Sequence, residues 1–500
     1  MRLSAFLALA FLAIAAGRPS LAAGGDSYHG GPDRSGRYIV PGLTWTRAAG
    51  ARLDPGFDGR VQGHVYAQPL YWRPPGAAHG RLIVATEDNF VQALDALSGR
   101  EVWRRSVGPA VARAALPCGD IDPLGITGTP AIDERTRTVF VDAMVDRGGG
   151  PRHLVFGLSL DDGSVRPGWP VDVAAALRAR GMAFDAGVQN QRGALTLVGD
   201  RLYLPFGGHF GDCGDYHGWV VGLRVGRPGL FGAWTTQARK GGIWAPGGMS
   251  FDGRFLYAAT GNTDGARQWG GGEAVIRLPP DLRWRPDPNS FFAPANWQAL
   301  DDADADLGGV APLPIDLSVG RGMAALLLAL GKDGNAYLLD RADLGGIGHP
   351  LAVRPVAQGR IITAPAAYRV GRDVLVAFQA LVPACPDGAQ NAGLAALRVS
   401  APGRDGLQVA WCAALDGRGA PMVTTTDGAA QPIVWIVGAE GDGRLHGFRG
   451  DTGAPVFGGG GAGDRMAGLR HFATILAAEG RLFVAGDGRV YAFGFGPGQQ

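Results

Sequence analysis

Eight copies of a short apolar segment recur along the chain, and this repetition constrains the fold more than any other feature. The copies are residues 91–95, 155–159, 220–224, 275–278, 336–340, 394–398, 445–449 and 490–493. A second strand-like segment precedes most copies, and a shorter segment punctuated by Pro or Gly, such as 66–69 or 127–130, precedes several of those. Eight recurrences in the same order exceed what turn composition produces by chance.

Each repeat predicts a small antiparallel sheet that cannot bury both of its faces alone. Stacking such sheets around a central axis buries both faces, which is the logic of a β-propeller. The sequence therefore predicts an all-β fold, an eight-bladed β-propeller with four-stranded antiparallel blades. The repeats are about 60 residues apart, so we expect the surplus residues in long loops on one face.

The ends of the chain predict how the ring closes. The last repeat has no outer strand after residues 490–493, and we expect residues 43–46 to supply it. Pairing there would cover an otherwise exposed strand edge. We also expect Trp103, Trp234 and Trp411, which lie after third strands, to fill the gaps between blades.

The composition agrees with this fold and excludes several functional classes. The 500 residues include 83 Gly and 34 Pro, yet 46% are hydrophobic, so the chain is not disordered. The 47 Lys and Arg nearly balance the 45 Asp and Glu, which gives no basic surface for nucleic acid.

The first residues predict export. Arg2 precedes an apolar run over residues 3–16, and the small-residue box Ser20-Leu21-Ala22 follows. The run is shorter than the roughly 20 apolar residues that span a membrane. We therefore expect a signal peptide over residues 1–22 and a single propeller domain over 23–500. We expect a periplasmic or secreted monomer with no membrane span and no lipoprotein cysteine.

Four cysteines are an even number in an oxidising compartment, and three disulfide pairings are possible. The sequence contains no Cys-x-x-Cys-His, so covalent haem is excluded. The cysteines are isolated, and no His/Cys spacing fits a zinc finger.

Residues 93–103 and 450–453 resemble the repeat of pyrroloquinoline-quinone (PQQ) proteins. The resemblance extends over nearly the whole mature chain and implies a propeller similar to that of the PQQ-dependent alcohol dehydrogenases. A broader set of exported PQQ-like repeat proteins, many without known activity, is also similar. The repeat is specific for the fold, and a fold by itself does not determine catalysis.

The resemblance also implies residues that would bind the quinone. Residues 241–244 match a family segment whose Trp stacks on the flat cofactor, which gives Trp244 this role. Residues 331–335 match a segment whose basic residue contacts the quinone oxygens, which points to Lys332. The alternatives are a Trp packed within a blade and an exposed Lys in a hairpin turn.

Acidic and amide residues complete the set that the resemblance implies. Asp306 lies in register with the catalytic base that takes the alcohol proton while hydride passes to the quinone. Asn262 matches an amide ligand of Ca²⁺, and Asp304 and Asp212 are further candidate ligands. The alternatives are a turn Asn and a solvated acidic loop.

Two positions depart from the dehydrogenases. Cys213 stands where they carry a Glu that ligates calcium, and Cys118 is single where they carry two adjacent cysteines. Because the resemblance places both positions at the central mouth, it implies a Cys118–Cys213 disulfide. The second disulfide would then be Cys385–Cys412, within the sixth blade.

The residues support two functional hypotheses and leave open whether the chain is an enzyme. The first is an envelope binding module that holds a small polar ligand or another envelope protein at the propeller mouth, without redox chemistry. The two departures from the dehydrogenases at Cys118 and Cys213 favour this hypothesis. Residues 189–192 are also expected to line the channel, and the amide and Arg side chains of this segment would need polar partners there. The second is a PQQ- and Ca²⁺-dependent dehydrogenase of alcohols or sugars that passes electrons to a separate acceptor.

Overall fold

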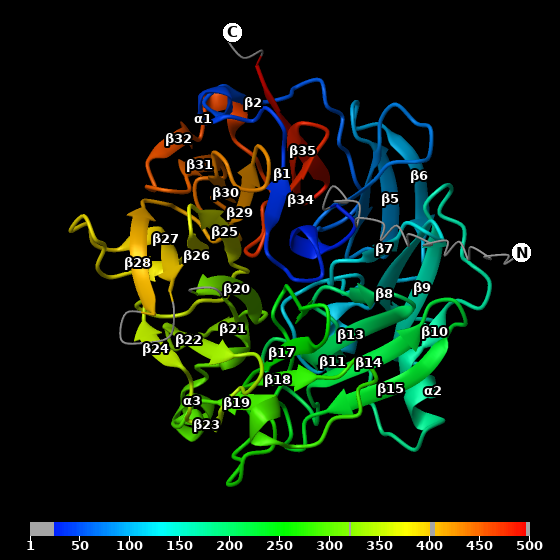
Figure 1. The fold of residues 1–500 in the computed structure, drawn as a ribbon. Helices are drawn as coiled ribbons and strands as arrows, with labels where there is room; N and C mark the ends of the chain where they lie inside the picture. Colours follow the sequence, from blue (N-terminus) through cyan, green and yellow to red (C-terminus); the bar gives the residue numbers. More distant parts are fainter. Residues whose placement is uncertain (1–24, 320–321, 401–405, 497–500) are drawn as a thin grey trace, which may run out of the picture.

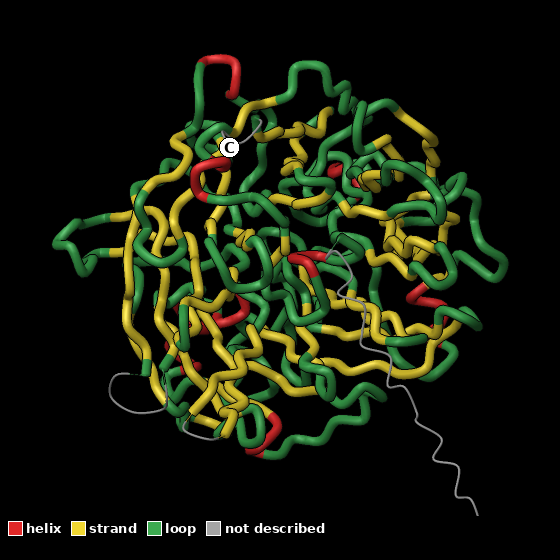
Figure 2. Tube along the Cα trace, turned by 45° about the horizontal axis from the view of Figure 1, so that its top comes forward, coloured by secondary structure: helices red, strands yellow, loops and turns green. Residues whose placement is uncertain are grey.

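The computed structural model describes residues 25–319, 322–400 and 406–496, so the expected signal peptide lies outside the described residues. Within these ranges the strands form eight sheets arranged in a ring around a central axis (Figure 1). Figure 2 shows that loops and a few short helices make up the rest of the chain. The prediction of an eight-bladed propeller is therefore confirmed.

In blades 1 to 7 the strands run outward from the axis in sequence order, and we number the blades from β3. Blades 1 to 4 contain β3 (Leu70–Trp72), β4 (Arg81–Ala85), β5 (Phe90–Asp95) and β6 (Glu101–Ser106); β7 (Ala131–Asp133), β8 (Thr138–Asp146), β9 (Pro151–Ser159) and β10 (Val171–Asp172); β11 (Gln189–Asn190), β12 (Thr196–Val198), β13 (Arg201–Gly208), β14 (Trp219–Arg224) and β15 (Gly229–Thr235); and β16 (Met249–Phe251), β17 (Leu256–Thr260), β18 (Ala274–Leu278) and β19 (Phe291–Ala293).

Blades 5 to 8 contain β20 (Leu313–Val319), β21 (Gly322–Leu330), β22 (Asn335–Asp340) and β24 (Ala352–Pro355); β25 (Ala366–Val370), β26 (Asp373–Val382), β27 (Ala392–Val399) and β28 (Leu407–Ala413); β29 (Met422–Thr425), β30 (Ile433–Val437), β31 (Leu445–Arg449) and β32 (Pro455–Gly458); and β33 (Ile475–Ala478), β34 (Arg481–Gly486), β35 (Arg489–Phe495) and β2 (Ala51–Leu53). In addition, β23 (Gly346–Ile347) pairs with the outer edge of blade 4 and β1 (Arg37–Ile39) with the inner edge of blade 7. The connections contain α1 (Trp45–Ala48), α2 (Val173–Arg178) and α3 (Trp297–Ala303).

The eight repeated segments are the third strands of the eight blades, as β5 and β35 illustrate. The shorter Pro-punctuated segments are not strands, because the inner strands begin after the prolines, at Leu70 after Pro69 and at Ala131 after Pro130. These segments therefore surround the axis at one end of the inner strands.

The N-terminal region closes the ring, but not with the expected residues. The outer strand of blade 8 is β2, which pairs antiparallel with β35. Residues 43–46 were the wrong choice because the side chain of Thr44 accepts a hydrogen bond from the Arg47 backbone N–H and caps α1. Leu43 is buried in the core instead.

The hydrophobic core lies mainly between neighbouring blades. One cluster joins Tyr368 of blade 6 to Val434 of blade 7, and both side chains are almost fully buried. Trp411 closes this gap by donating its indole N–H to the Gly450 carbonyl at 2.8 Å. Trp103 makes the equivalent bond from blade 1 to Leu160 in blade 2 at 3.0 Å. These two tryptophans fill gaps between blades as predicted. The burial of each contributes about 3 kcal/mol to the stability of the fold.

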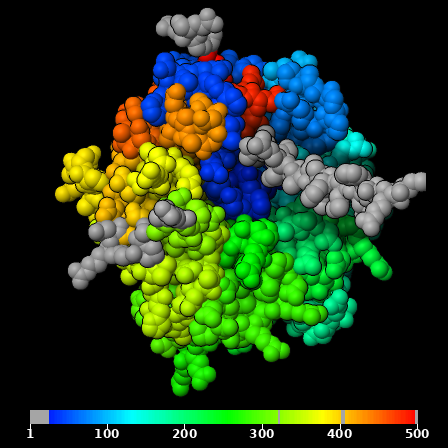
Figure 3. All heavy atoms as spheres, in the orientation of Figure 1, coloured from blue at the N-terminus to red at the C-terminus, as the bar shows by residue number. Residues whose placement is uncertain are grey.

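Residues 25–36, which we call the axial segment, occupy the centre of the ring (Figure 3). Carbonyl groups of this segment accept hydrogen bonds from amides of the inner strands of blades 1, 2, 4, 6 and 7. The donors are the backbone N–H groups of Tyr71, Ile132, Phe251, Ala367 and Val423. The segment therefore satisfies inner-edge amides that the ring leaves without a strand partner.

Arg34 anchors the axial segment from the inside. Its guanidinium is almost fully buried and donates to the carbonyls of Met249, Leu195 and Tyr28 at 3.0, 2.9 and 3.1 Å. A further bond reaches the Thr196 hydroxyl at 2.8 Å. Burial lowers the pKa of Arg34 to about 10, so the side chain still carries its charge at neutral pH.

Candidate functional site

Four residues that the sequence singled out meet where blades 4 and 5 face each other. Asp306 is buried and its Oδ2 accepts a hydrogen bond from Trp244 Nε1 at 3.0 Å. Its Oδ1 accepts from the backbone N–H of Asn262 at 3.0 Å. Lys332 Nζ lies 2.7 Å from Oδ2 of the same carboxylate. We call these four residues the Asp306 cluster.

Lys332 is a buried partner of two carboxylates rather than an exposed turn residue. Its side chain is only 11% exposed, and Nζ also lies 2.8 Å from Oδ1 of Asp304. The ammonium group sits 5.1 Å from the centre of the Trp244 ring, a distance typical of a cation–π contact. The pKa of Lys332 is raised because the attraction of the two carboxylates outweighs its burial.

Glu273 is a second buried carboxyl beside the Asp306 cluster, and the sequence analysis missed it. Its Oε2 accepts a hydrogen bond from the Leu307 backbone N–H at 2.7 Å, whereas Oε1 has no partner among the described residues. Burial, together with the negative charge of Asp306, raises the pKa of Glu273 to about 9. Glu273 is therefore neutral at pH 7. It follows three glycines, a context that gave no recognisable motif.

Asp212 is engaged elsewhere. Its Oδ1 accepts a hydrogen bond from the Tyr216 hydroxyl at 2.6 Å. Burial, and then the negative charges of Asp212, Asp306 and Asp304, raise the pKa of Tyr216.

The contacts of these residues bear on whether they could hold a calcium ion. In the described part of the chain no three His, Cys, Asp or Glu side chains come together in a way that would hold a metal ion. Asn262 reaches Asp306 through its backbone, and Lys332 neutralises Asp304 and Asp306. The donor set therefore does not fit the calcium ion, and the face of Trp244 toward Lys332 is not free for a flat ring.

Both predicted disulfides are present. Cys118 bonds Cys213 across 95 residues and links the loops of blades 1 and 3. Cys385 bonds Cys412 across 27 residues within blade 6. Disulfides persist in oxidising compartments, so these bonds indicate an extracytoplasmic location. Among the helices that the structure describes, none is long and apolar enough to cross a membrane.

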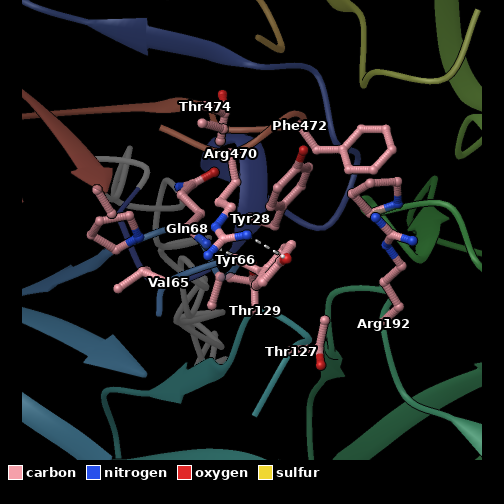
Figure 4. A pocket seen from close by; sticks show the side chains of 15 residues that line it. Tyr28, Val65, Tyr66, Gln68, Thr127, Thr129, Arg192, Arg470, Phe472 and Thr474 are labelled. Carbon is pink, nitrogen blue, oxygen red and sulfur yellow. Dashed lines mark hydrogen bonds between the residues drawn. The ribbon is translucent and has the colours of Figure 1, made fainter. Parts of the chain in front are cut away.

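A cavity opens at the axis beside the axial segment, and we call it the axial cavity (Figure 4). It has a volume of about 20 Å³, room for about one ordered water molecule, within a recess that opens to solvent. Its lining comes from the axial segment and from the loops before several inner strands, and includes Tyr28, Tyr66, Thr127, Arg192, Arg470 and Phe472. Residues 189–192 were expected to line the channel, and Arg192 does so.

Two hydroxyl groups in this lining have no hydrogen-bond partner in the described part of the chain. They belong to Tyr28, from the axial segment, and Thr127, from the loop before β7, and both are buried. The Thr127 hydroxyl lies beside the Glu87 carboxyl, however, and opposes the rise in the pKa of that group. Buried polar groups in folded proteins are nearly always paired with protein, water or ligand. The axial cavity is therefore built to face a polar molecule.

Arg470 organises the opposite wall of the axial cavity. Its Nη2 and Nε lie 2.6 and 2.9 Å from Asp487 Oδ2, and Nη1 donates to the Tyr66 hydroxyl at 3.2 Å, the bond drawn in Figure 4. Its charge is thus balanced by Asp487. The sequence analysis missed Arg470, Tyr66 and Tyr28, since no local motif marks them.

Comparison with solved structures places the fold among known propellers. The quinohemoprotein alcohol dehydrogenase from Comamonas testosteroni aligns with a TM-score of 0.65 at 14% sequence identity, over 95% of this chain and 81% of that chain. The chain shares the fold of these quinoproteins. At this identity the likeness concerns the fold alone.

Two further solved structures have a similar fold. Quinohemoprotein alcohol dehydrogenase ADHIIG from Pseudomonas putida HK5 aligns with a TM-score of 0.64 at 13% identity, over 95% of this chain and 81% of that one. A europium-containing methanol dehydrogenase aligns with a TM-score of 0.59 at 14% identity, over 93% and 91%. No family model matches the chain, and no curated protein sequence matches it.

Proposed function

We propose that this protein is a periplasmic or secreted binding propeller that holds a small polar ligand in its axial cavity and carries out no redox chemistry. The observation that carries the proposal is the buried Tyr28 hydroxyl in the cavity wall, which has no hydrogen-bond partner among the described residues. The signal-like N-terminus and the two disulfides support the location.

The state of Asp306 supports a structural role for its cluster. Three donors already occupy its two oxygens: Trp244 Nε1, the Asn262 N–H and Lys332 Nζ. The cluster thus ties blade 4 to blade 5.

A small ligand fits the cavity better than the other expected occupant, an envelope protein. The unpartnered hydroxyls lie within a concave site whose floor is the axial segment, and small-molecule sites are concave with a few convergent polar groups. A protein surface would reach only the rim.

Thermal shift measurements on the purified protein test the proposal. Neutral polyols, sugars, amino acids and small acids would be screened, and at least one class should raise the melting temperature. Thr127→Val should abolish that shift, because it removes a cavity hydroxyl with little change in shape. Thr452→Val is the matched control, since Thr452 lies in the exposed β31–β32 turn. Absence of any shift, with no molecule found by native mass spectrometry, would refute the proposal.

The second candidate is a PQQ-dependent dehydrogenase of alcohols or sugars. The observation in its favour is that Trp244, Asp306 and Lys332 come together. The calcium donors do not fit, so we derive no catalytic step. Reconstitution with PQQ and Ca²⁺, followed by dye reduction with an alcohol panel, decides the matter. Turnover that Asp306→Asn abolishes would establish the dehydrogenase, and no quinone absorbance and no turnover would eliminate it.

A further inference from the structure

Arg192 is a positively charged residue in the lining of the axial cavity. Among the residues that the structure describes, no carboxylate forms a salt bridge with it. It follows β11, in the break between β11 and β12, and lies among the cavity-lining residues (Figure 4). Its Nη2 lies 3.4 Å from His471 Nε2, and its guanidinium stacks 4.6 Å from the centre of the Phe472 ring. Neither contact brings a negative charge to the guanidinium.

Two carboxylates near the cavity contact side chains other than Arg192. Asp487 pairs with Arg470 at 2.6 Å, and Glu440 pairs with His471 at 2.6 Å. Within the described ranges no carboxylate forms a salt bridge with Arg192.

Two more carboxyl groups act on Arg192 from a distance. Burial lowers the pKa of Arg192, while the charges of Asp120, Tyr66 and Glu87 oppose this shift. Asp120 is exposed to solvent, which screens its charge. Burial raises the pKa of Glu87 to about 7, so near neutral pH this group is only partly ionised. The positive charge of Arg192 is therefore left largely uncompensated.

We propose that the axial cavity is a binding site for a small oxyanion, with Arg192 as its charged anchor and the Tyr28 and Thr127 hydroxyls as neutral donors. This inference rests on the proposed function and adds the chemical class of the ligand. Carboxylates and phosphate share the oxygen pair that a planar guanidinium matches with two parallel hydrogen bonds.

The geometry assigns the anchor to Arg192 rather than to Arg470. Arg470 already spends its donors on Asp487, Tyr66 and His64. Arg192 keeps donors for a ligand, and the Phe472 ring holds its guanidinium plane in place. Partial burial of Arg192 reduces solvent screening, which strengthens its attraction for an anion.

Isothermal titration calorimetry on the full chain as purified tests this inference. Acetate, succinate and inorganic phosphate form the anionic arms, which distinguish carboxylates from phosphate, and glycerol and glucose form the neutral arms. We expect binding in at least one anionic arm and none in the neutral arms. Affinity should fall as sodium chloride is raised.

Variants locate the site. Arg192→Gln should weaken anion binding about tenfold to a hundredfold, the range expected for a lost hydrogen bond to a charged group. Arg192→Lys keeps the charge but not the planar fork and should bind at an intermediate level. Arg372→Gln, at the exposed β25–β26 turn, is the control and should bind like the parent.

The outcomes separate this inference from the proposed function. Binding of a neutral molecule that Thr127→Val abolishes, without anion binding, would overturn the oxyanion site and keep the binding propeller. Anion binding that Arg192→Gln leaves unchanged would also overturn it, because the anion would then bind elsewhere. Binding in none of the arms, together with no hit in the wider thermal shift screen, would overturn both.

Discussion

Lys332 Nζ lies 2.7 Å from Asp306 Oδ2; the aspartate is buried and the lysine side chain is 11% exposed. This ion pair occupies the place where the sequence predicted a base and a cofactor-binding lysine. The two residues stabilise each other through their charges. The same contact holds the ammonium group in front of the Trp244 ring.

Removing the lysine should therefore be costly. Lys332→Met leaves the Asp306 charge buried without its partner, and breaking a buried ion pair in this way costs about 3–5 kcal/mol. Asp306→Asn should rescue much of that loss in the double variant. Denaturation midpoints of the parent, the two single variants and the double variant give the coupling energy. A loss below about 1 kcal/mol would mean that the pair is no stronger than a surface ion pair.

Glu273 should make stability depend on pH. Its pKa is about 9 in the folded protein and 4.5 in the unfolded chain, so between these values the folded state binds more protons. The contribution of Glu273 to the free energy of unfolding is thus fully present below pH 4.5. This contribution declines as the pH rises toward 9, by up to about 1.4 kcal/mol per pH unit.

Glu273→Gln removes this titration. The variant should match the parent near pH 5 and become more stable than the parent at pH 8, as measured by melting temperature across a pH series. A difference between the two proteins that stays constant from pH 5 to pH 9 would show that the Glu273 carboxyl does not titrate in this range.

The axial segment should depend on Arg34. Arg34→Ala removes donors to the carbonyls of Met249, Leu195 and Tyr28 and leaves these buried acceptors unpaired, at about 1–3 kcal/mol each. Hydrogen exchange of residues 25–36 should accelerate by at least about tenfold. Arg37→Ala, at an exposed neighbouring position, should leave exchange unchanged. Equal exchange in both variants would show that the backbone bonds alone hold the segment.

The two disulfides should contribute unequally. In the chain-entropy model the 95-residue separation of Cys118 and Cys213 corresponds to about 4.7 kcal/mol, and the 27-residue separation of Cys385 and Cys412 to about 3.5 kcal/mol. Replacing the first pair by serine should therefore lower the denaturation midpoint more than replacing the second. The reverse order would indicate that native contacts of the loops, rather than chain entropy, decide the effect.

Local periodicity was enough to predict the blades. The third strand of every blade lies where an apolar repeat had been recognised, because a strand buried on both faces is encoded as a short, nearly continuous apolar run. The closing strand was misplaced because a cap at Thr44 turns residues 45–48 into a helix and moves the strand to Ala51–Leu53. The hydrogen bond that caps the helix at Thr44 therefore decided the local structure, although the sequence pattern of residues 43–46 is also compatible with a strand.

The candidate site was predictable only in part. The order of Trp244, Asn262, Asp306 and Lys332 along the chain anticipated their meeting, and their catalytic roles stay a prediction. Glu273 gave no signal, since its raised pKa comes from burial and from Asp306, 33 residues away in the sequence.

The sequence by itself determined the repeat and the number of blades, since both follow from the spacing of the apolar segments. The tertiary structure decided which polar groups are satisfied. Arg192 meets Phe472 and His471 from blades far apart in the chain, and Tyr28 reaches the cavity from the axial segment. Such contacts exist only after the ring closes, because closure brings every inner strand to one axis.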